Sequence, residues 1–258
     1  VYKQTPADLD LTPYLEYKDD EAIANIKKYA KEVPHVVAQD MKLSTIRPGI
    51  LHVYFDSGRD MAKTLLRFQE FYESPEFRGK YFTLADYIKW YTKKNGKFDY
   101  YQGWGEENGN GFNLPSFVFK PFFAKKFDPL STQENEFLNL FRYKMHAPFY
   151  VVITASNSED EIKHEMAHAL FYTNPQYKKN VLAVLKKYPV KKLEQFLLTK
   201  YGYSKYVVLD EAHAWIMQDL DYLEKDGFDA KPYRSATSEL RALYGKYFQP
   251  FDQPIIDR

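Results

Sequence analysis

Residues 158–172 read SEDEIKHEMAHALFY, and this stretch places His164, Glu165 and His168 within about one turn of a predicted helix. Because residues four apart lie on one face of a helix, the two imidazoles can reach the same metal ion, and the glutamate lies beside them. Ser158 and the acid three residues later form a capping box, and apolar residues recur every three or four positions. The stretch therefore predicts a metal-binding helix of the pattern H-E-x-x-H.

These residue types suit hydrolytic chemistry. Neutral imidazole is a good ligand for Zn²⁺, and a catalytic zinc site has three protein ligands and a fourth position for water. Zinc lowers the pKa of that water toward neutrality, and Glu165 can take the water's proton during attack on a carbonyl. Because His164 and His168 supply only two ligands, the motif requires a third one elsewhere in the chain.

The third ligand is predicted in a second helix, expected over about residues 205–224. This helix contains VLDEAHAWIM, residues 208–217, in which Glu211 is followed one turn later by the small Ala214. A small residue would let the second helix pack closely against the first, so that Glu211 completes a His₂Glu ligand set. Asp210 and His213 are alternatives at this spacing. Three histidines are also a sound ligand set, but His213 lies roughly 200° around the helix from Glu211.

The motifs H-E-M-A-H at 164–168 and D-E-A-H-A at 210–214 resemble those of the gluzincins, a group of zinc metallopeptidases. This group includes thermolysin-like enzymes and the anthrax lethal factor peptidase domain. The resemblance covers about residues 149–224. It implies that both histidines of the first motif and Glu211 of the second bind one zinc ion per chain, and that Glu165 acts as the general base.

The sequence departs from the gluzincin pattern at one position. Thermolysin-like enzymes carry an aspartate one turn after the glutamate ligand, where it orients a histidine, whereas this chain has Trp215 there. We expect Asp210 to make the contact instead, because metal-bound imidazoles usually donate their other N–H to a carboxylate or a carbonyl. Gluzincins also use a tyrosine or histidine to stabilise the oxyanion. Tyr201, Tyr203 and Tyr206 lie in the expected part of the chain, of which Tyr203 and Tyr206 are the candidates for this role, and His146 is a further candidate.

The predicted function is that of a zinc-dependent endopeptidase acting on a peptide or protein substrate. Two alternatives are open at this stage. One is a non-catalytic binding protein with a structural or degenerate metal site, although a structural site has no need of a base such as Glu165. The other is an oxygenase, in which two histidines and one carboxylate hold Fe(II). No motif marks the walls of a substrate pocket, so the sequence does not predict specificity.

Composition argues against several other classes. The 258 residues carry a net charge of +1 with no basic stripe, so nucleic acid is not expected as a partner. The absence of cysteine excludes disulfides, thiolate metal sites and a cysteine nucleophile. No apolar run approaches the roughly 20 residues of a membrane span, and no signal peptide is recognised, which indicates a soluble chain. The start at Val1 is compatible with a processed or exported product. Neither the compartment nor the oligomeric state is predicted.

The expected architecture is α+β and zincin-like, with a small sheet and a helix-dominated C-terminal half. An N-terminal scaffold and sheet region, 1–145, is expected to precede a helical metal-site region, 146–258, within one compact domain. Apolar and aromatic runs predict strands near residues 50–55, 98–101, 116–120 and 149–154. Apart from the two motif helices, periodicity and capping residues predict helices over about 20–33, 60–72, 83–94, 128–142, 175–188 and 190–200.

Two segments have the features of substrate-binding elements. Residues 98–123 combine clustered glycines with aromatic runs, which predicts a long loop between paired strands that is either a lid, a binding edge or a surface excursion. The strand at 149–154 leads directly into the metal helix. In zinc peptidases such a neighbouring strand can pair with an extended substrate backbone.

Overall fold

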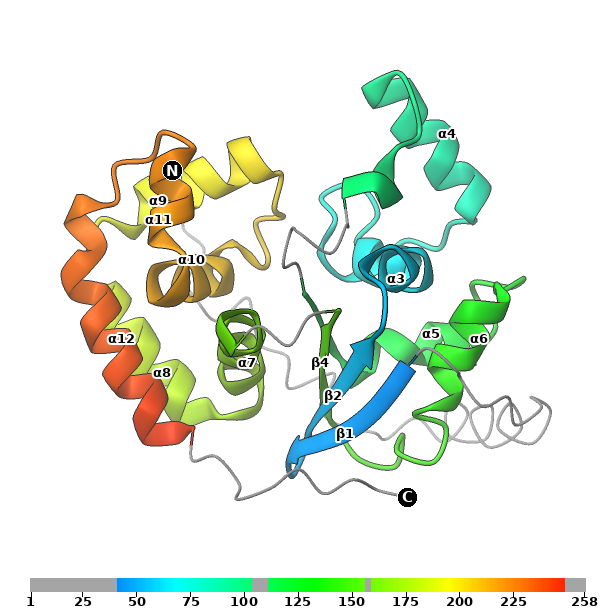
Figure 1. Cartoon of the computed structure of the whole chain (residues 1–258), viewed down its shortest axis with the longest axis horizontal. Helices are drawn as coiled ribbons and strands as arrows, with labels where there is room; N and C mark the ends of the chain where they lie inside the picture. Colours follow the sequence, from blue (N-terminus) through cyan, green and yellow to red (C-terminus); the bar gives the residue numbers. More distant parts are fainter. Residues whose placement is uncertain (1–40, 104–110, 156–158, 249–258) are drawn as a thin grey trace.

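A small mixed sheet lies at the centre of the computed structural model, which describes residues 41–103, 111–155 and 159–248 (Figure 1). In the order β1-β2-β4-β3, its strands are β1 (Met41–Arg47), β2 (Ile50–Phe55), β4 (Tyr150–Thr154) and β3 (Phe112–Pro115). Strands β2 and β4 run parallel, whereas β1 is antiparallel to β2 and β3 is antiparallel to β4. The sheet and the many helices around it confirm the α+β class, and the sheet joins strands from both sides of residue 145.

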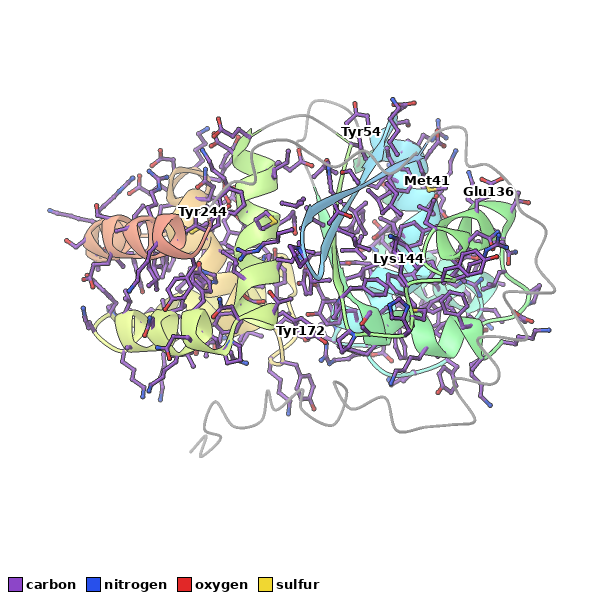
Figure 2. All side chains as sticks on the ribbon, turned by 90° about the horizontal axis from the view of Figure 1, so that it is seen from below. Met41, Tyr54, Glu136, Lys144, Tyr172 and Tyr244 are labelled. Atoms are coloured by element: carbon purple, nitrogen blue, oxygen red, sulfur yellow. The ribbon has the colours of Figure 1, made fainter. Side chains whose placement is uncertain are left out.

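Strand β4 is buried on both faces because successive side chains of a strand point in opposite directions. Tyr150 and Val152 belong to one hydrophobic cluster, and Val151 and Ile153 belong to the other. Helices therefore cover the sheet on both sides, as an all-apolar strand predicts. Figure 2 shows these two helical layers on either side of the sheet, with Tyr244 in one and Glu136 in the other.

The first helical layer consists of α3 (Gly58–Glu73), α4 (Leu84–Asn95), α5 (Lys120–Phe123) and α6 (Thr132–Asn139). Helix α4 begins at a capping box in which Thr83 and Asp86 bond each other's backbone, and Ser131 and Glu134 do the same for α6. The hydrophobic cluster on this side of the sheet is rich in phenylalanine rings. For example, Phe68 stacks on Phe122 with the ring centres 3.8 Å apart. The aromatic residues of this half therefore build a core.

An ion pair is buried within the first layer. Arg67 of α3 donates to both carboxylate oxygens of Glu134, at 2.6 and 2.5 Å, and to the carbonyls of Phe127 and Pro129. Both charged side chains are almost fully buried, with 3% and 5% of their surface exposed. Removing one partner would leave the other charge in the core without compensation.

We expect Glu134→Ala to lower the free energy of unfolding by about 3–5 kcal/mol, because it strands the Arg67 guanidinium in the core. Denaturant unfolding monitored by circular dichroism measures this change. The control is Asp56→Ala, which breaks an exposed ion pair with Lys42 and should change stability by less than about 1 kcal/mol. Equal effects of the two substitutions would contradict a structural role for the buried pair.

The second layer, drawn in green to red in Figure 1, contains the remaining helices. These are α7 (Glu159–Thr173), α8 (Pro175–Leu185), α9 (Val190–Phe196), α10 (Val208–Gln218), α11 (Leu220–Lys225) and α12 (Arg234–Tyr247). Helix α7 packs directly on β4, and α10 packs on the outer side of α7. Acids fill the first turn of α7, where the positive end of the helix dipole favours them.

Most helices of both layers were predicted from the sequence, but α12 and the edge strand β1 were not. The predicted strands 50–55 and 149–154 are confirmed, but those at 98–101 and 116–120 are wrong. Short 3₁₀ turns occupy Tyr100–Gly103 and Ser116–Phe119, and the strand of this region, β3, lies between them in the chain. In the second turn, consecutive side chains are buried in the same cluster, which the alternation of a strand does not allow.

The single helix predicted over 205–224 is also wrong, because it breaks at Asp219 into α10 and α11. Three expectations lie outside the described residues: the helix ahead of Pro34, the cap at Ser158 and the centre of the glycine-rich loop at 104–110. Among the helices described, none combines the length and apolar composition needed to cross a membrane.

Candidate metal centre

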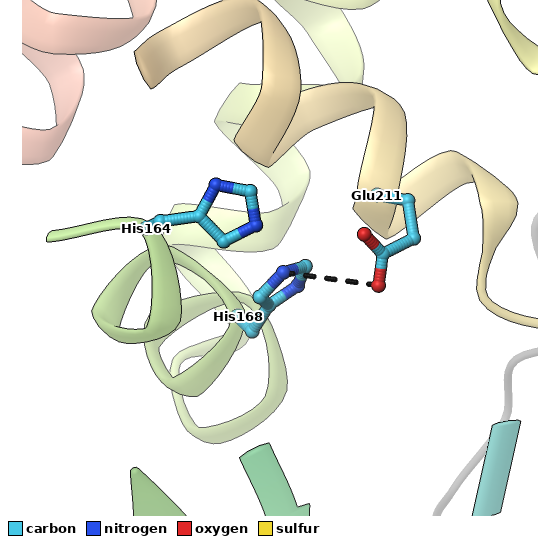
Figure 3. Close-up of side chains that lie close together, drawn as sticks. All are labelled: His164, His168 and Glu211. Atoms are coloured by element: carbon cyan, nitrogen blue, oxygen red, sulfur yellow. Dashed lines mark ion pairs between the residues drawn. The ribbon is translucent and has the colours of Figure 1, made fainter. Parts of the chain in front are cut away.

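Helices α7 and α10 bring three predicted ligands together. His164 and His168 lie one turn apart on α7, and Glu211 reaches them from the first turn of α10 (Figure 3). One ligand atom from each residue lies within 4.8 Å of the others. Ala214, the small residue expected at the helix contact, is fully buried. The residues that the two motifs predicted therefore converge at one place.

Both histidines are oriented by carboxylates. The Nδ1 atom of His164 lies 2.5 Å from a carboxylate oxygen of Asp219, and that of His168 lies 3.0 Å from Asp210. Because an ionised carboxylate can only accept, each Nδ1 donates its proton to the carboxylate, and Nε2 is the ring atom that can bind a metal. The expected contact from Asp210 is confirmed, and it orients His168.

The orienting role of Asp219 was missing from the sequence analysis. Asp219 follows Glu211 by eight residues, two turns on, whereas the gluzincin pattern places an aspartate one turn on, at the position of Trp215. It reaches His164 because α10 ends at Gln218 and the backbone turns there. The indole of Trp215 instead meets the His164 ring edge-on, with the ring centres 5.8 Å apart.

The donor set could hold a metal ion. The Nε2 atom of His168 lies 3.8 Å from a carboxylate oxygen of Glu211. Two ligands bound to one zinc in tetrahedral geometry at about 2.0–2.1 Å are separated by about 3.3–3.5 Å, so the His168–Glu211 pair is already close to the spacing that such an ion requires. Glu211 is only 3% exposed and forms no ion pair with lysine or arginine among the residues described. A bound cation would supply the compensation that a buried carboxylate requires.

The metal-free site binds protons tightly. Burial by itself lowers the pKa of His168, but the carboxylates of Asp210 and Glu211 outweigh burial and raise that pKa well above its ordinary value. Burial opposes ionisation of Asp210, yet the neighbouring His168 brings the pKa of Asp210 down to about 2. A metal ion must therefore displace a proton from His168 before it can bind.

We expect zinc affinity to rise with pH between about pH 6 and 8, by up to about tenfold per pH unit for each proton displaced. The sign follows from the raised pKa of His168: below that pKa the ring is protonated, so competition grows as the pH falls. Titration against a chromophoric chelator at several pH values measures the dissociation constant. An affinity that is constant or that increases on acidification would contradict the assignment of His168 as a ligand.

Glu165 lies in the same cavity as the three ligands. It is 6% exposed, and one of its carboxylate oxygens accepts a hydrogen bond of 2.7 Å from the side chain of Asn113 on β3. Asn113 was not predicted from the sequence, although a polar residue between Phe112 and Leu114 in an otherwise apolar strand was a usable signal. The glycine-rich region thus contributes the edge strand of the site, β3.

The predicted oxyanion donors have different locations. Tyr203 lines the cavity, and its hydroxyl accepts a hydrogen bond of 3.3 Å from the indole N–H of Trp215. Burial and the nearby carboxylate of Glu211 raise the pKa of Tyr203 well above its ordinary value, so its hydroxyl proton is retained. By contrast, Tyr206 is 44% exposed against Arg78, and His146 is exposed; neither is among the cavity-lining residues.

His213, the alternative ligand, faces away from the metal group. It is fully buried, its Nε2 lies 2.9 Å from the hydroxyl of Tyr177, and its ring stacks on Phe171. Burial lowers the pKa of His213, which keeps the ring neutral in this packed position. Its other nitrogen lies 3.4 Å from Asp210. His213 therefore supports the residue that orients His168.

The metal group opens into a cavity of about 1120 Å³ between the two layers. Carboxylates dominate its charged lining, which consists of Glu73, Asp160, Glu161, Glu165, Glu211, Asp219, Asp221, Lys163 and Arg241. The two cations are already engaged, since Lys163 pairs with Glu159 and Arg241 donates to a backbone carbonyl. Burial and the neighbouring Glu211 raise the pKa of Glu73 well above its ordinary value. The cavity lining therefore carries more carboxylates than lysine and arginine side chains.

Comparison of the chain with descriptions of known protein families, with curated proteins and with solved structures gave no match. A function for this chain must therefore be argued from its own residues and their geometry.

Proposed function

We propose that this chain is a zinc-dependent endopeptidase of the gluzincin type with a zincin-like fold. The observation that carries the proposal is the convergence of His164, His168 and Glu211 beside Glu165 in one cavity. Three protein ligands, rather than four, leave a position for water, as in catalytic zinc sites. The arrangement of α7 between β4 and α10 supports the zincin-like fold.

The residues of the cavity have separate roles in this proposal. Bound zinc would lower the pKa of a water molecule toward neutrality and polarise the carbonyl under attack. Glu165 takes the proton from the attacking water and passes it to the leaving amine. Tyr203 accepts a hydrogen bond from Trp215 and has its hydroxyl beside the Glu211 carboxylate; it would donate a hydrogen bond to the oxyanion once that carboxylate binds the metal.

The electrostatics of the cavity indicate which substrates to test. A cavity lined mainly by carboxylates attracts cations and repels anions. Strand β4 has neighbours on both sides, so the expected pairing of a substrate with residues 149–154 is not available. Strand β3 ends the sheet beside α7, and we propose it as the element that receives an extended peptide.

The proposal is tested with the purified 258-residue chain and a pool of unstructured peptides rich in lysine and arginine. We expect about one zinc per chain, cleavage of internal peptide bonds, loss of cleavage with a chelator and recovery with added zinc. Metal analysis measures the zinc content, and mass spectrometry of the products measures cleavage under each condition. One iron per chain would favour the Fe(II) oxygenase instead. A zinc-loaded protein that cleaves no peptide would favour a structural metal site.

A further inference from the structure

We infer that Asn113 positions Glu165 and that Tyr150 in turn fixes Asn113. The inference rests on the proposed function, because it concerns the general base of that reaction. Neither Asn113 nor Tyr150 was predicted as a site residue. The two lie on different strands, β3 and β4, on the face of the sheet that α7 covers. The sheet therefore holds the carboxylate of a residue on the metal helix.

A continuous hydrogen-bond chain connects the three side chains. The hydroxyl of Tyr150 lies 2.5 Å from Oδ1 of Asn113, and Nδ2 of Asn113 lies 2.7 Å from Oε2 of Glu165. All three residues are buried, with exposed fractions of 0%, 6% and 6%. In a buried environment such bonds are stronger than in water, and chains of them are mutually reinforcing.

The chemistry of the three side chains determines which group donates and which accepts in each of these hydrogen bonds. An ionised Glu165 has only acceptor atoms, so Asn113 must present its amide N–H₂ to it. The amide oxygen of Asn113 then faces Tyr150, which supplies its hydroxyl proton to that oxygen. Rotating the amide by 180° would bring its oxygen against the carboxylate, which is repulsive. Tyr150 therefore selects the amide orientation that binds a carboxylate.

Burial of Asn113 would be unfavourable without these bonds. The residues flanking it in β3, Phe112 and Leu114, point into the cluster on the opposite face of the sheet. Asn113 points toward α7, where an apolar side chain would pack without needing partners. An amide buried without hydrogen bonds costs about 1–3 kcal/mol, so its presence here requires both Tyr150 and Glu165 as partners.

Gly111 confines Glu165 by a second contact. A Cβ atom at Gly111 would lie 2.8 Å from both Cγ and Oε1 of Glu165 and 3.0 Å from the carbonyl oxygen of Ile153. Only a residue without a side chain lets the chain pass this close to the base. Glu165 is therefore restricted by an amide at Oε2 and by backbone beside Oε1. Such restriction favours a single carboxylate position, which proton transfer requires.

The test is a double-mutant cycle with Asn113→Leu and Glu165→Gln. Leucine has nearly the shape of asparagine but cannot donate to the carboxylate. We expect Asn113→Leu to lower kcat for peptide cleavage about 10- to 100-fold, with KM and zinc content unchanged. In the Glu165→Gln background, Asn113→Leu should have almost no further effect, because its action passes through the missing base. Equal losses in both backgrounds, or an unchanged kcat, would overturn the inference.

A milder variant keeps the inference testable if Asn113→Leu does not fold. Tyr150→Phe keeps the core intact and removes only the hydroxyl, and we expect kcat to fall about twofold to tenfold through loss of one hydrogen bond. The matched control is Tyr233→Phe, which removes a buried tyrosine hydroxyl that donates to the Pro189 carbonyl, away from the cavity. Equal effects of Tyr150→Phe and Tyr233→Phe on kcat would also overturn the inference.

Failure of the proposed function is distinguishable from failure of this inference. If zinc-loaded wild-type protein cleaves no peptide, the endopeptidase proposal fails, and crystal structures then test the positioning role. In Asn113→Leu, or in Tyr150→Phe if the first variant does not fold, we expect the Glu165 carboxylate to occupy more than one position. An unchanged, singly ordered Glu165 in that structure would show that Asn113 does not position it.

Discussion

Glu165→Gln is expected to reduce peptide cleavage about 100- to 10,000-fold while leaving the zinc content near one per chain. Glutamine has nearly the same size as glutamate, and its amide oxygen can still accept the hydrogen bond from Asn113. It cannot take a proton from the attacking water. The measurements are kcat/KM for a cleaved peptide, and metal content of the same preparation.

The control for Glu165→Gln is the same exchange at Glu159, an exposed residue on the same helix that pairs with Lys163. This control removes one negative charge from α7 without reaching the reacting atoms, so it should change kcat/KM by less than about threefold. Full activity in Glu165→Gln would exclude general-base catalysis by this residue. Loss of zinc in Glu165→Gln would show instead that the glutamate contributes to metal binding.

The sequence predicted those parts of the site that local geometry determines. Two histidines four apart must share a face of any helix they form, so their common target could be predicted before the structure. Glu211 was predicted because the small Ala214 one turn away marks the face that packs against α7. The amphipathic helices and their caps, such as Thr83 ahead of α4, also follow from patterns within a few residues.

The parts that the sequence did not predict depend on contacts between distant segments. Asp219 orients His164 across 55 positions of the chain, and Asn113 reaches Glu165 across 52. No local period links such pairs, and the break in the helix that directs Asp219 has no glycine or proline to signal it. Strand β3 was also misplaced, because the aromatic run at Ser116–Phe119 forms a buried 3₁₀ turn rather than a strand.

The structure also distinguishes between two tyrosines that the sequence predicted equally as oxyanion donors. Tyr203 and Tyr206 have similar positions ahead of α10, and with 23 tyrosines in the chain neither stands out by type. Of these two, Tyr203 lines the cavity and lies close enough to the buried Glu211 for that carboxylate to raise its pKa. The preference for Tyr203 as oxyanion donor therefore comes from three-dimensional placement, and the exposed Tyr206 is no longer proposed for that role.

The third ligand is tested by comparing Glu211→Ala with His213→Ala. We expect Glu211→Ala to weaken zinc affinity by more than about 100-fold, because even the loss of an outer contact weakens metal sites about 10- to 100-fold. His213→Ala should retain about one zinc per chain, since this ring contacts Tyr177 and Phe171 rather than the metal group. Metal content after dialysis and the dissociation constant for zinc measure both effects.

Stability must be followed in the same two variants, because both side chains are buried. Glu211 sits among other carboxylates, so removing its charge should be tolerated by the metal-free fold, whereas His213→Ala opens a cavity beside Tyr177 and should lower the melting temperature. The expected pattern is therefore crossed: Glu211→Ala loses zinc but not its metal-free stability, and His213→Ala loses stability but not zinc. If His213→Ala emptied the site while Glu211→Ala stayed loaded, the ligands would be three histidines on a differently rotated α10, and the gluzincin proposal would fail at its second motif.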